Sequence, residues 1–185
     1  MAENSKLPIG IIVNKIELSS NESSTNKDFT HYKSLGYDVH FVSVKNQTNL
    51  DSFKEKLVNK SHIFLGQSGV GKSSLINSLI PDLELRVNEI SNKSKLGKHT
   101  TTNTTIYHIP SGGDLIDSPG VREFQLENLT ELEIKSGFKE FKALSNECRF
   151  RDCRHINEPN CAVKDSLDQG KISNNRYQSY LNILP

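Results

Sequence analysis

Short apolar runs alternate with stretches whose apolar residues recur at helical spacing over the first two thirds of the chain. Five runs have the length and composition of strands: Pro8–Val13, Tyr37–Val44, His62–Leu65, Thr104–Ile109 and Asp114–Ile116. Three stretches between them are typical of helices: Asn26–Leu35, Leu50–Val58 and Lys72–Leu79. This alternation predicts an α/β fold with a mostly parallel sheet covered by helices.

The last part of the chain has a different pattern. Residues 110–113, Pro-Ser-Gly-Gly, separate the last two strands and predict an antiparallel hairpin at the edge of the sheet. After Glu127 the apolar spacing is helical, apart from an irregular segment that contains Cys and His. Tyr177, Tyr180, Leu181 and Leu184 recur at helical spacing, which indicates core packing. We therefore predict an α/β domain over residues 1–125 and a small helical domain over residues 126–185.

Composition narrows the class of protein. The chain has 185 residues, and its 23 Lys and Arg against 22 Asp and Glu leave a formal net charge of +1, which gives no case for a strongly basic nucleic-acid binder. No apolar run approaches the roughly 18–20 residues that span a bilayer. The first residues also lack the apolar core of a signal peptide. We expect a cytoplasmic protein that makes no membrane contact.

A glycine-rich segment carries the strongest chemical signal. It matches G-x-x-x-x-G-K-[ST] and lies between a predicted strand and a predicted helix. Its residues are Gly66, Gln67, Ser68, Gly69, Val70, Gly71, Lys72 and Ser73, followed by Ser74. Glycines let the backbone wrap around phosphate oxygens, and the helix N-terminus adds its positive end. We expect Lys72 to reach the β- and γ-phosphates and Ser73 to bind Mg²⁺. This phosphate loop (residues 66–73) does not by itself separate ATP from GTP, or a kinase from a hydrolase.

Two further segments have the pattern of elements that sense the γ-phosphate. Asp117-Ser118-Pro119-Gly120 follows an apolar strand and matches D-x-x-G, in which the Asp lies near Mg²⁺ and the Gly amide bonds the γ-phosphate. Residues 86–103 are polar and basic and lack periodicity, and we expect a mobile loop. Within it, Thr100 or Thr101 is the candidate to close over Mg²⁺ and the γ-phosphate. Taken singly, these segments also fit a β-turn and a polar loop.

A third segment, after the first strand, indicates which base is bound. Asn14-Lys15-Ile16-Glu17 approximates N-K-x-D, the pattern that binds guanine through its base edge while the Lys stem packs over the ring. Glu17 keeps the carboxylate on a stem one methylene longer, so we expect its geometry to change guanine affinity more than the choice of guanine. After the second strand, the segment that begins at Ser43 is either a source of a backbone N–H for guanine O6 or a plain strand end. We call residues 14–17 the base-reading segment.

The three cysteines of the chain cluster with one histidine. Cys148-x4-Cys153-x-His155-x5-Cys161 supplies three thiolates and one imidazole, a closed set suited to structural Zn²⁺. The alternative is three reduced cysteines in a surface segment. Arg149, Arg151 and Arg154 lie close to this cluster and are candidates for RNA contact, or else form a solvated charged face.

The order of these motifs carries a resemblance. The base-reading segment precedes the phosphate loop, whereas ordinary GTPases place it after. With the segments 66–74, 97–102 and 112–124 and the Cys/His cluster, the chain resembles the circularly permuted GTPases that depend on the small ribosomal subunit, the RsgA family, also called YjeQ or YloQ. The resemblance implies a Rossmann-like P-loop GTPase fold with motif order G4-G5-G1-G2-G3, followed by a helical zinc-binding domain.

The resemblance also implies a function. It predicts GTP hydrolysis stimulated by the 30S ribosomal subunit during late maturation, contact with 16S rRNA, action as a monomer, and the cofactors GTP or GDP, Mg²⁺ and one structural Zn²⁺. Val121 stands where many GTPases keep a catalytic Gln, so the family suggests His99 as the residue that positions the water, with Lys72 and Thr101 completing the catalytic set. Members of the family carry an N-terminal OB-fold domain that this sequence does not include, and we expect a shortened member.

Two other functions are compatible with the motifs. A P-loop ATPase or kinase would lack a base-reading segment, and competition between GTP and ATP separates it from a GTPase. A non-enzymatic RNA-binding zinc module with a vestigial nucleotide site would show no GTP turnover, with or without 30S subunits.

Overall fold

The computed structural model describes residues 3–5, 7–19, 29–67, 69–80, 83, 105–117 and 129–185, without the side chains of Thr105 and Asp117. They form two compact units that interleave along the chain. The first unit comprises Met1–Ile11, Asn26–Val39 and Gln125–Pro185, and the second comprises Ile12–Thr25 and His40–Phe124. The division predicted at residue 125 stays a prediction.

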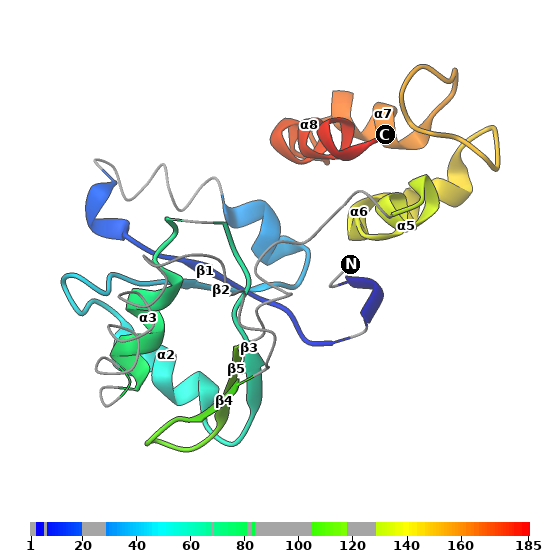
Figure 1. Ribbon diagram of the computed structural model, residues 1–185. Coiled ribbons are helices and arrows are strands. Elements are labelled where there is room, and N and C mark those ends of the chain that lie inside the picture. The colour runs from blue at the N-terminus through cyan, green and yellow to red at the C-terminus, as the bar shows by residue number, and fades with distance from the viewer. Residues whose placement is uncertain are drawn as a thin grey trace, which may run out of the picture. The chain divides into compact units, whose positions relative to one another are not determined.

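The second unit contains the predicted hairpin. β4 (Thr105–His108) pairs antiparallel with β5 (Asp114–Asp117), and β5 pairs in parallel with β3 (Ser61–Ile63), which gives the order β3-β5-β4 (Figure 1). At the hairpin, Gly113 has φ 101°, and a Cβ there would lie 2.5 Å from the Leu57 carbonyl oxygen. Only glycine fits this close approach of two backbones, as the turn sequence predicts.

The strands form two sheets rather than the single sheet that the pattern predicts. β1 (Gly10–Val13) and β2 (Asp38–Phe41) make a separate two-stranded sheet. β3 ends at Ile63, two residues earlier than predicted. Val42, which follows β2, and Leu115 in β5 nevertheless belong to one apolar core. The second unit is thus held together by burial of these side chains rather than by one continuous ladder.

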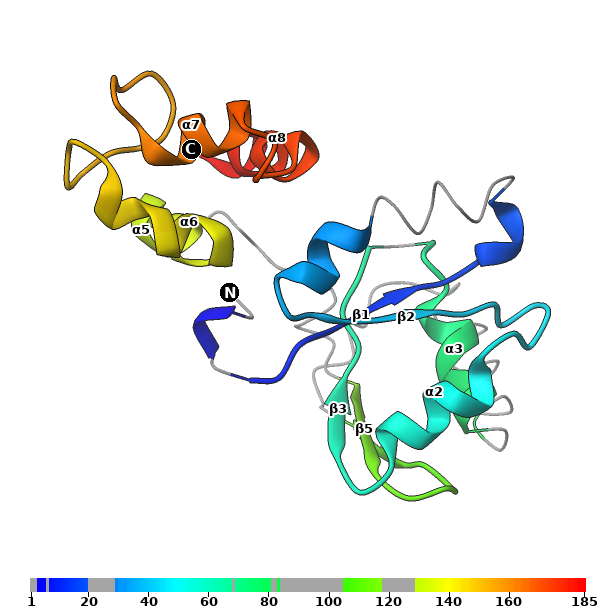
Figure 2. The same ribbon diagram turned by 180° about the vertical axis from the view of Figure 1, so that it is seen from behind.

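Two helices complete the core of the second unit. α2 (Leu50–Leu57) and α3 (Lys72–Leu79) match the predicted helices, and both contribute to the apolar core around Leu115 (Figure 2). α2 buries Leu50, Phe53 and Leu57. α3 buries Leu75 and Leu79, four residues apart on one face, so that its first turn is left free at the phosphate loop.

The first unit is mostly helical, and the helical pattern predicted after Glu127 is present in its C-terminal part. Its elements are η1 (Glu3–Ser5), α5 (Glu131–Ser136), α6 (Lys139–Leu144), η6 (Ser145–Glu147), α7 (Ala162–Asp168) and α8 (Asn174–Ile183), and residues 29–34 are also helical. Phe138, Phe141, Tyr177 and Tyr180 form its aromatic core. A capping box between Thr130 and Glu133 begins α5. None of the helices built from described residues is long and apolar enough to cross a membrane.

A buried ion pair holds the helical segment 29–34 to the C-terminal helices. Arg176 in α8 donates from Nε to Glu140 Oε1 at 2.7 Å and from Nη2 to Oε2 at 3.2 Å. Its guanidinium also lies 5.2 Å from the ring centre of Tyr32, in segment 29–34, and 4.5 Å from that of Phe138. Burial alone would raise the pKa of Glu140, but the hydrogen bonds and charge of Arg176 hold it below its usual value. The pair therefore stays ionised inside the unit.

Removing one partner of this pair should destabilise the protein strongly. We expect Glu140→Ala to lower the free energy of unfolding by about 3 kcal/mol, because it leaves Arg176 buried without its counter-charge. The double change Glu140→Leu with Arg176→Met should cost far less, since no charge stays buried. Urea unfolding measures both. Lys54→Ala, which breaks an exposed pair with Asp51, is the control and should change stability by under about 0.5 kcal/mol. A Glu140→Ala effect as small as the control would contradict a structural role for the pair.

Candidate nucleotide-binding and metal sites

The phosphate loop connects β3 to α3. Gly71, with φ 92°, is the residue before the first turn of α3, and Lys72 is its first residue. Lys72 Nζ donates to the carbonyl oxygens of Gly66 and Gln67, the latter at 3.0 Å, so the loop curls around the ammonium group. Ser73 and Ser74 are exposed in the first turn of α3. The loop thus presents a cation and two hydroxyls at a helix N-terminus, a typical anion-binding arrangement.

The base-reading segment is bound directly to this loop. Asn14 Nδ2 donates to the Val70 carbonyl oxygen at 3.1 Å, and Lys15 Nζ donates to the Gly69 carbonyl oxygen at 2.6 Å. Lys15 adopts the left-handed backbone conformation, φ 63°, as the chain turns out of β1. A Cβ on Gly71 would lie 2.4 Å from Asn14 Nδ2 and would displace the Asn14 amide, and the positive φ of 92° also favours glycine.

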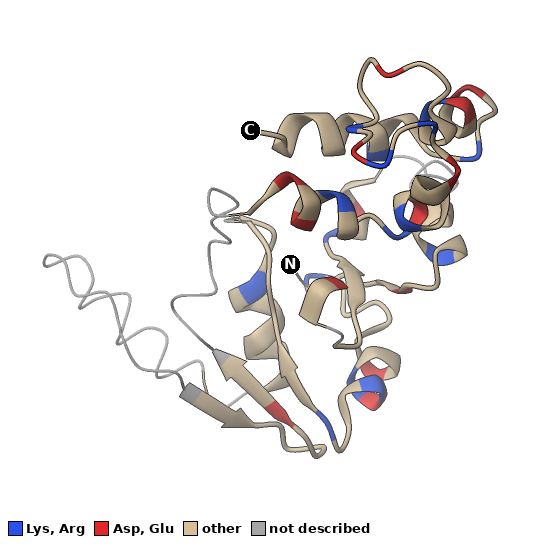
Figure 3. Ribbon diagram, turned by 90° about the vertical axis from the view of Figure 1, so that its right-hand side faces the viewer, with Lys and Arg blue, Asp and Glu red and all other residues tan. Residues whose placement is uncertain are grey.

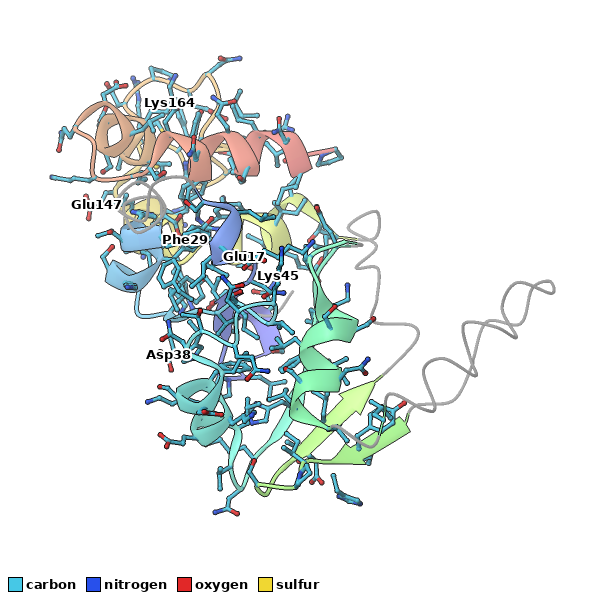
Figure 4. The ribbon with its side chains drawn as sticks, turned by 90° about the vertical axis from the view of Figure 1, so that its left-hand side faces the viewer. Glu17, Phe29, Asp38, Lys45, Glu147 and Lys164 are labelled. Carbon is cyan, nitrogen blue, oxygen red and sulfur yellow. The ribbon has the colours of Figure 1, made fainter. Side chains whose placement is uncertain are left out.

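Together the two segments line a pocket of about 280 Å³. Its lining residues are Asn14, Lys15, Glu17, Val44, Lys45, Gly71 and Ser74. Figure 4 labels Glu17 and Lys45, whose side chains lie near each other. Two acceptor atoms of this pocket, Asn14 Oδ1 and Glu17 Oε2, are buried with no hydrogen-bond partner among the described residues. Because such atoms are costly to leave unpaired, the pocket suits a ligand that brings N–H donors.

Ser43 acts on this pocket through Glu17. It is fully buried, and its backbone N–H donates to the Thr48 carbonyl oxygen at 3.1 Å. Ser43 Oγ accepts from the Asn46 N–H at 3.0 Å, and its hydroxyl hydrogen-bonds the Glu17 carboxylate. That bond, supported by the nearby charges of Lys45 and Lys15, lowers the pKa of Glu17. The carboxylate is therefore ionised at neutral pH and available as an acceptor.

The predicted γ-phosphate elements are described only in part. Asp117 ends β5, and its backbone pairs opposite Thr105. β3 and β5 are neighbouring parallel strands. The phosphate loop and Asp117 therefore lie at the same end of the sheet, where the carboxyl ends of these two strands meet. The other predicted residues, Ser68, His99, Thr100, Thr101 and Gly120, lie outside the described residues.

The four predicted metal ligands come together in the first unit. The ligand atoms of Cys148, Cys153, His155 and Cys161 all lie within 4.8 Å of one another. His155 Nδ1 lies 3.6 Å from Cys148 Sγ and 3.3 Å from Cys161 Sγ, and the two sulfurs are 4.0 Å apart. Bond lengths of about 2.3 Å to sulfur and about 2.0 Å to nitrogen place the ligands of a tetrahedral zinc ion about 3.5–3.8 Å apart. The arrangement fits such an ion.

Burial changes the pKa values of two of the candidate metal ligands. It raises the pKa of Cys153 to about 12 and lowers the pKa of His155 to about 4. A neutral imidazole is the form that binds metal, and buried thiolates need a positive ion beside them. The loop is held by Glu158, whose carboxylate accepts from the N–H groups of Arg154, Ile156 and Asn157. Tyr177 donates its hydroxyl to the His155 carbonyl oxygen at 2.6 Å.

Sequence reasoning missed Ser145, whose Oγ lies 3.3 Å from His155 Nε2. A serine ten residues before the histidine, in no motif, gives no signal of this kind in a single sequence. Tyr177 and Tyr180 were predicted as core, and their burial confirms this. The helical spacing could not show that both hydroxyls bind the segment of the four candidate ligands, residues 148–161, which we call the metal loop. Tyr177 binds it through the His155 carbonyl oxygen, and Tyr180 binds it through the Arg154 carbonyl oxygen at 2.7 Å.

Residues of both charge signs occur along the chain near the cluster, as the blue and red parts of the ribbon show for the first unit (Figure 3). Arg149 and Arg151 are exposed, and the Arg149 guanidinium lies 5.3 Å from the ring centre of Phe150, which is 39% exposed. Arg154 instead pairs with Glu131 at 2.7 Å. Of the three predicted RNA-contact residues, Arg149 and Arg151 thus make no ion pair with a described residue. They flank the exposed ring of Phe150 in the sequence.

Fold and site define a P-loop nucleotide-binding protein in which the base-reading segment precedes the phosphate loop. A sequence profile of the RsgA GTPase matches residues 1–127. The chain belongs to the RsgA GTPase family.

Named relatives support this assignment. The chain is 46% identical over 185 residues to the small ribosomal subunit biogenesis GTPase RsgA of Shewanella oneidensis, covering 99% of this chain and 52% of that protein. It is 45% identical over 175 residues to the protein of the same name from Chromohalobacter salexigens, covering 94% and 52%. The chain thus spans about half the length of these relatives.

Solved structures of two similar proteins agree with this family assignment. The crystal structure of YjeQ from Thermotoga maritima matches with a TM-score of 0.77 and 31% identity, over 98% of this chain and 60% of that one. That of YloQ, described as a circularly permuted GTPase, matches with a TM-score of 0.72 and 31% identity, over 94% and 54%. These matches confirm the predicted fold class.

The contact between the loop and the base-reading segment can be tested at Gly71. We expect Gly71→Ala to weaken GDP binding about tenfold, because the added Cβ displaces Asn14 and breaks its hydrogen bond to Val70. Titration calorimetry measures the affinity. Gly170→Ala is a matched control: Gly170 has φ 71°, but nothing lies within 4 Å of its Cβ position. If both variants bind GDP as the unchanged chain does, the two segments do not depend on each other.

Proposed function

We propose that this chain binds guanine nucleotides with Mg²⁺ and hydrolyses GTP, as part of a protein that acts in the maturation of the small ribosomal subunit. The observation that carries the proposal is the pair of hydrogen bonds from Asn14 and Lys15 to the phosphate loop. It places the base-reading segment directly beside the phosphate loop. The family and the names of the relatives support the same activity.

Guanine fits the unpaired acceptors of the pocket. Its N1–H and N2–H₂ groups are neighbouring donors, and the ionised Glu17 carboxylate offers them Oε2. The Lys15 stem packs over the ring. The Ser43 N–H is used by Thr48, so any N–H given to guanine O6 comes from Val44 or Lys45, which line the pocket. Adenine has no N–H donor at its N1 position, and this favours a GTPase over the ATPase alternative.

Hydrolysis proceeds by in-line attack of water on the γ-phosphate, with GDP leaving. Lys72 and the loop N–H groups stabilise the charge that develops on the phosphate oxygens. Mg²⁺, held by Ser73 and Thr101 and near Asp117, would neutralise the β- and γ-phosphates. His99 orients the attacking water, and the Gly120 amide bonds the γ-phosphate. Thr100 is the alternative to Thr101 as the threonine that binds Mg²⁺.

One structural Zn²⁺ is the fitting occupant of Cys148, Cys153, His155 and Cys161. Four protein ligands leave no open position for a substrate, so the ion would stabilise the fold rather than catalyse a reaction. Its role would be to fix the loop that presents Arg149 and Arg151.

The partner we propose is the 30S subunit, through 16S rRNA, with the protein acting as a monomer in the cytoplasm. Exposed Arg149 and Arg151 suit phosphate contact, and Phe150 between them suits base stacking. The same surface favours a second candidate function, an RNA-binding zinc module with a vestigial nucleotide site. Turnover separates the two.

GTP turnover with and without 30S subunits tests the proposal. We expect GTP turnover to rise when 30S subunits are added. Unlabelled GTP should compete with the labelled substrate, and ATP should not. Lys72→Ala should reduce it at least a hundredfold, because the loop loses its phosphate-facing charge. Lys56→Ala, in the last turn of α2, is the control and should leave it unchanged. Equal turnover for Lys72→Ala and the unchanged chain would refute the phosphate-loop assignment, and no turnover in the unchanged chain would favour the RNA-binding module.

Metal removal tests the zinc site. Cys153→Ser should release zinc and unfold the metal loop, because ion binding supplies local folding energy. GDP binding should largely survive, since the nucleotide pocket is built from the second unit. Elemental analysis and GDP titration measure the two effects. Absence of zinc from the unchanged protein would contradict the metal assignment.

A further inference from the structure

We infer that Ser145 is a positioning residue for the metal site: it fixes the tautomer of His155 so that Nδ1 faces the three cysteine sulfurs. The inference rests on the zinc site proposed above. It assigns a function to a residue that has no ligand atom in the cluster and lies in no motif.

The argument begins with the one hydrogen of the Ser145 hydroxyl. Ser145 Oγ lies 2.8 Å from the Phe141 carbonyl oxygen and 3.3 Å from His155 Nε2. A carbonyl oxygen can only accept, so the shorter contact requires the serine hydrogen. Toward His155, the same oxygen then has only lone pairs to offer.

The position of the hydrogen on the His155 ring follows from this. A ring nitrogen that meets a lone pair must carry a hydrogen, so His155 Nε2 is the N–H of the ring. In a neutral imidazole, Nδ1 is then the free lone pair. Nδ1 is also the atom beside Cys161 Sγ, at 3.3 Å, and Cys148 Sγ, at 3.6 Å. The chain from Phe141 through Ser145 to His155 thus prepares Nδ1 as the ligand.

The surroundings hold the ring in this orientation. His155 is fully buried, and its ring meets that of Phe141 edge-on, with centres 5.7 Å apart. Its carbonyl oxygen is held by the Tyr177 hydroxyl. Without Ser145, a buried Nε2–H would lose its acceptor, and the opposite tautomer would place an N–H against the sulfurs in place of the lone pair.

The test compares zinc affinity in full-length variants by competition with a chromogenic chelator. We expect Ser145→Ala to bind zinc about tenfold more weakly. Ser145→Thr keeps the hydroxyl and should restore most of the affinity. Ser179→Ala is the matched control, because Ser179 Oγ donates in the same way to the carbonyl oxygen four residues earlier, that of Asn175, at 2.8 Å, and makes no hydrogen bond with the candidate metal ligands. An unchanged affinity in Ser145→Ala would overturn the inference.

A spectroscopic readout separates positioning from general stability. In the zinc-loaded unchanged protein, long-range ¹H–¹⁵N correlation of the histidine ring should show hydrogen on Nε2 of His155 and none on Nδ1. Hydrogen on Nδ1, or coordination through Nε2, would overturn the inference even if Ser145→Ala fails to fold. Failure of the unchanged protein to bind zinc would instead remove the metal site on which the inference rests.

Discussion

The nucleotide pocket depends on two hydrogen bonds that cross from one segment to another more than fifty residues away. Asn14 and Lys15 each donate to a carbonyl oxygen of the phosphate loop, Val70 and Gly69. In the proposed function, these bonds join the site for the base to the site for the phosphates. Gly71 makes the approach possible, because any Cβ at that position would occupy the space of the Asn14 amide. Although the base-reading segment precedes the phosphate loop in the chain, the two segments meet at one pocket.

Much of this was predictable from the sequence, for reasons that particular residues make clear. Residues 66–73 carry a motif whose spacing is set by phosphate geometry, and Lys72–Leu79 form the helix that the apolar spacing predicts. Cys148, Cys153, His155 and Cys161 are rare residue types in one segment, so their clustering was visible. Contacts made by common residues were not visible. Ser43 was a candidate to offer its backbone N–H to the base, but the sequence could not show that this N–H goes to Thr48 and that its hydroxyl bonds Glu17. Ser145, which bonds His155, does not differ in the sequence from the many other serines. The division into two sheets was also missed, because a strand pattern does not show where a ladder stops.

The first unit shows how a small helical body holds the loop of the four candidate metal ligands in place. Its aromatic residues serve two purposes: Tyr177 and Tyr180 fill the core, and their hydroxyls bind carbonyl oxygens of the loop. Arg176, in the same helix, binds Glu140 and stacks near Tyr32. Tyr32 lies in the helical segment 29–34, which follows the base-reading segment in the chain and precedes Ser43. The connection between the two segments that line the base pocket is thus anchored in the unit that carries the metal ligands.

The most direct test of the account is the affinity of the chain for GDP, compared by calorimetry with that for ADP and for inosine diphosphate. All three share the phosphates and ribose, so the differences report on the base alone. We predict that GDP binds at least a hundredfold more tightly than ADP, and that inosine diphosphate, which keeps N1–H but lacks the 2-amino group, lies between them. Equal affinity for GDP and ADP would contradict the assignment of Asn14, Lys15 and Glu17 to guanine, and with it the central claim that base and phosphate sites form one pocket.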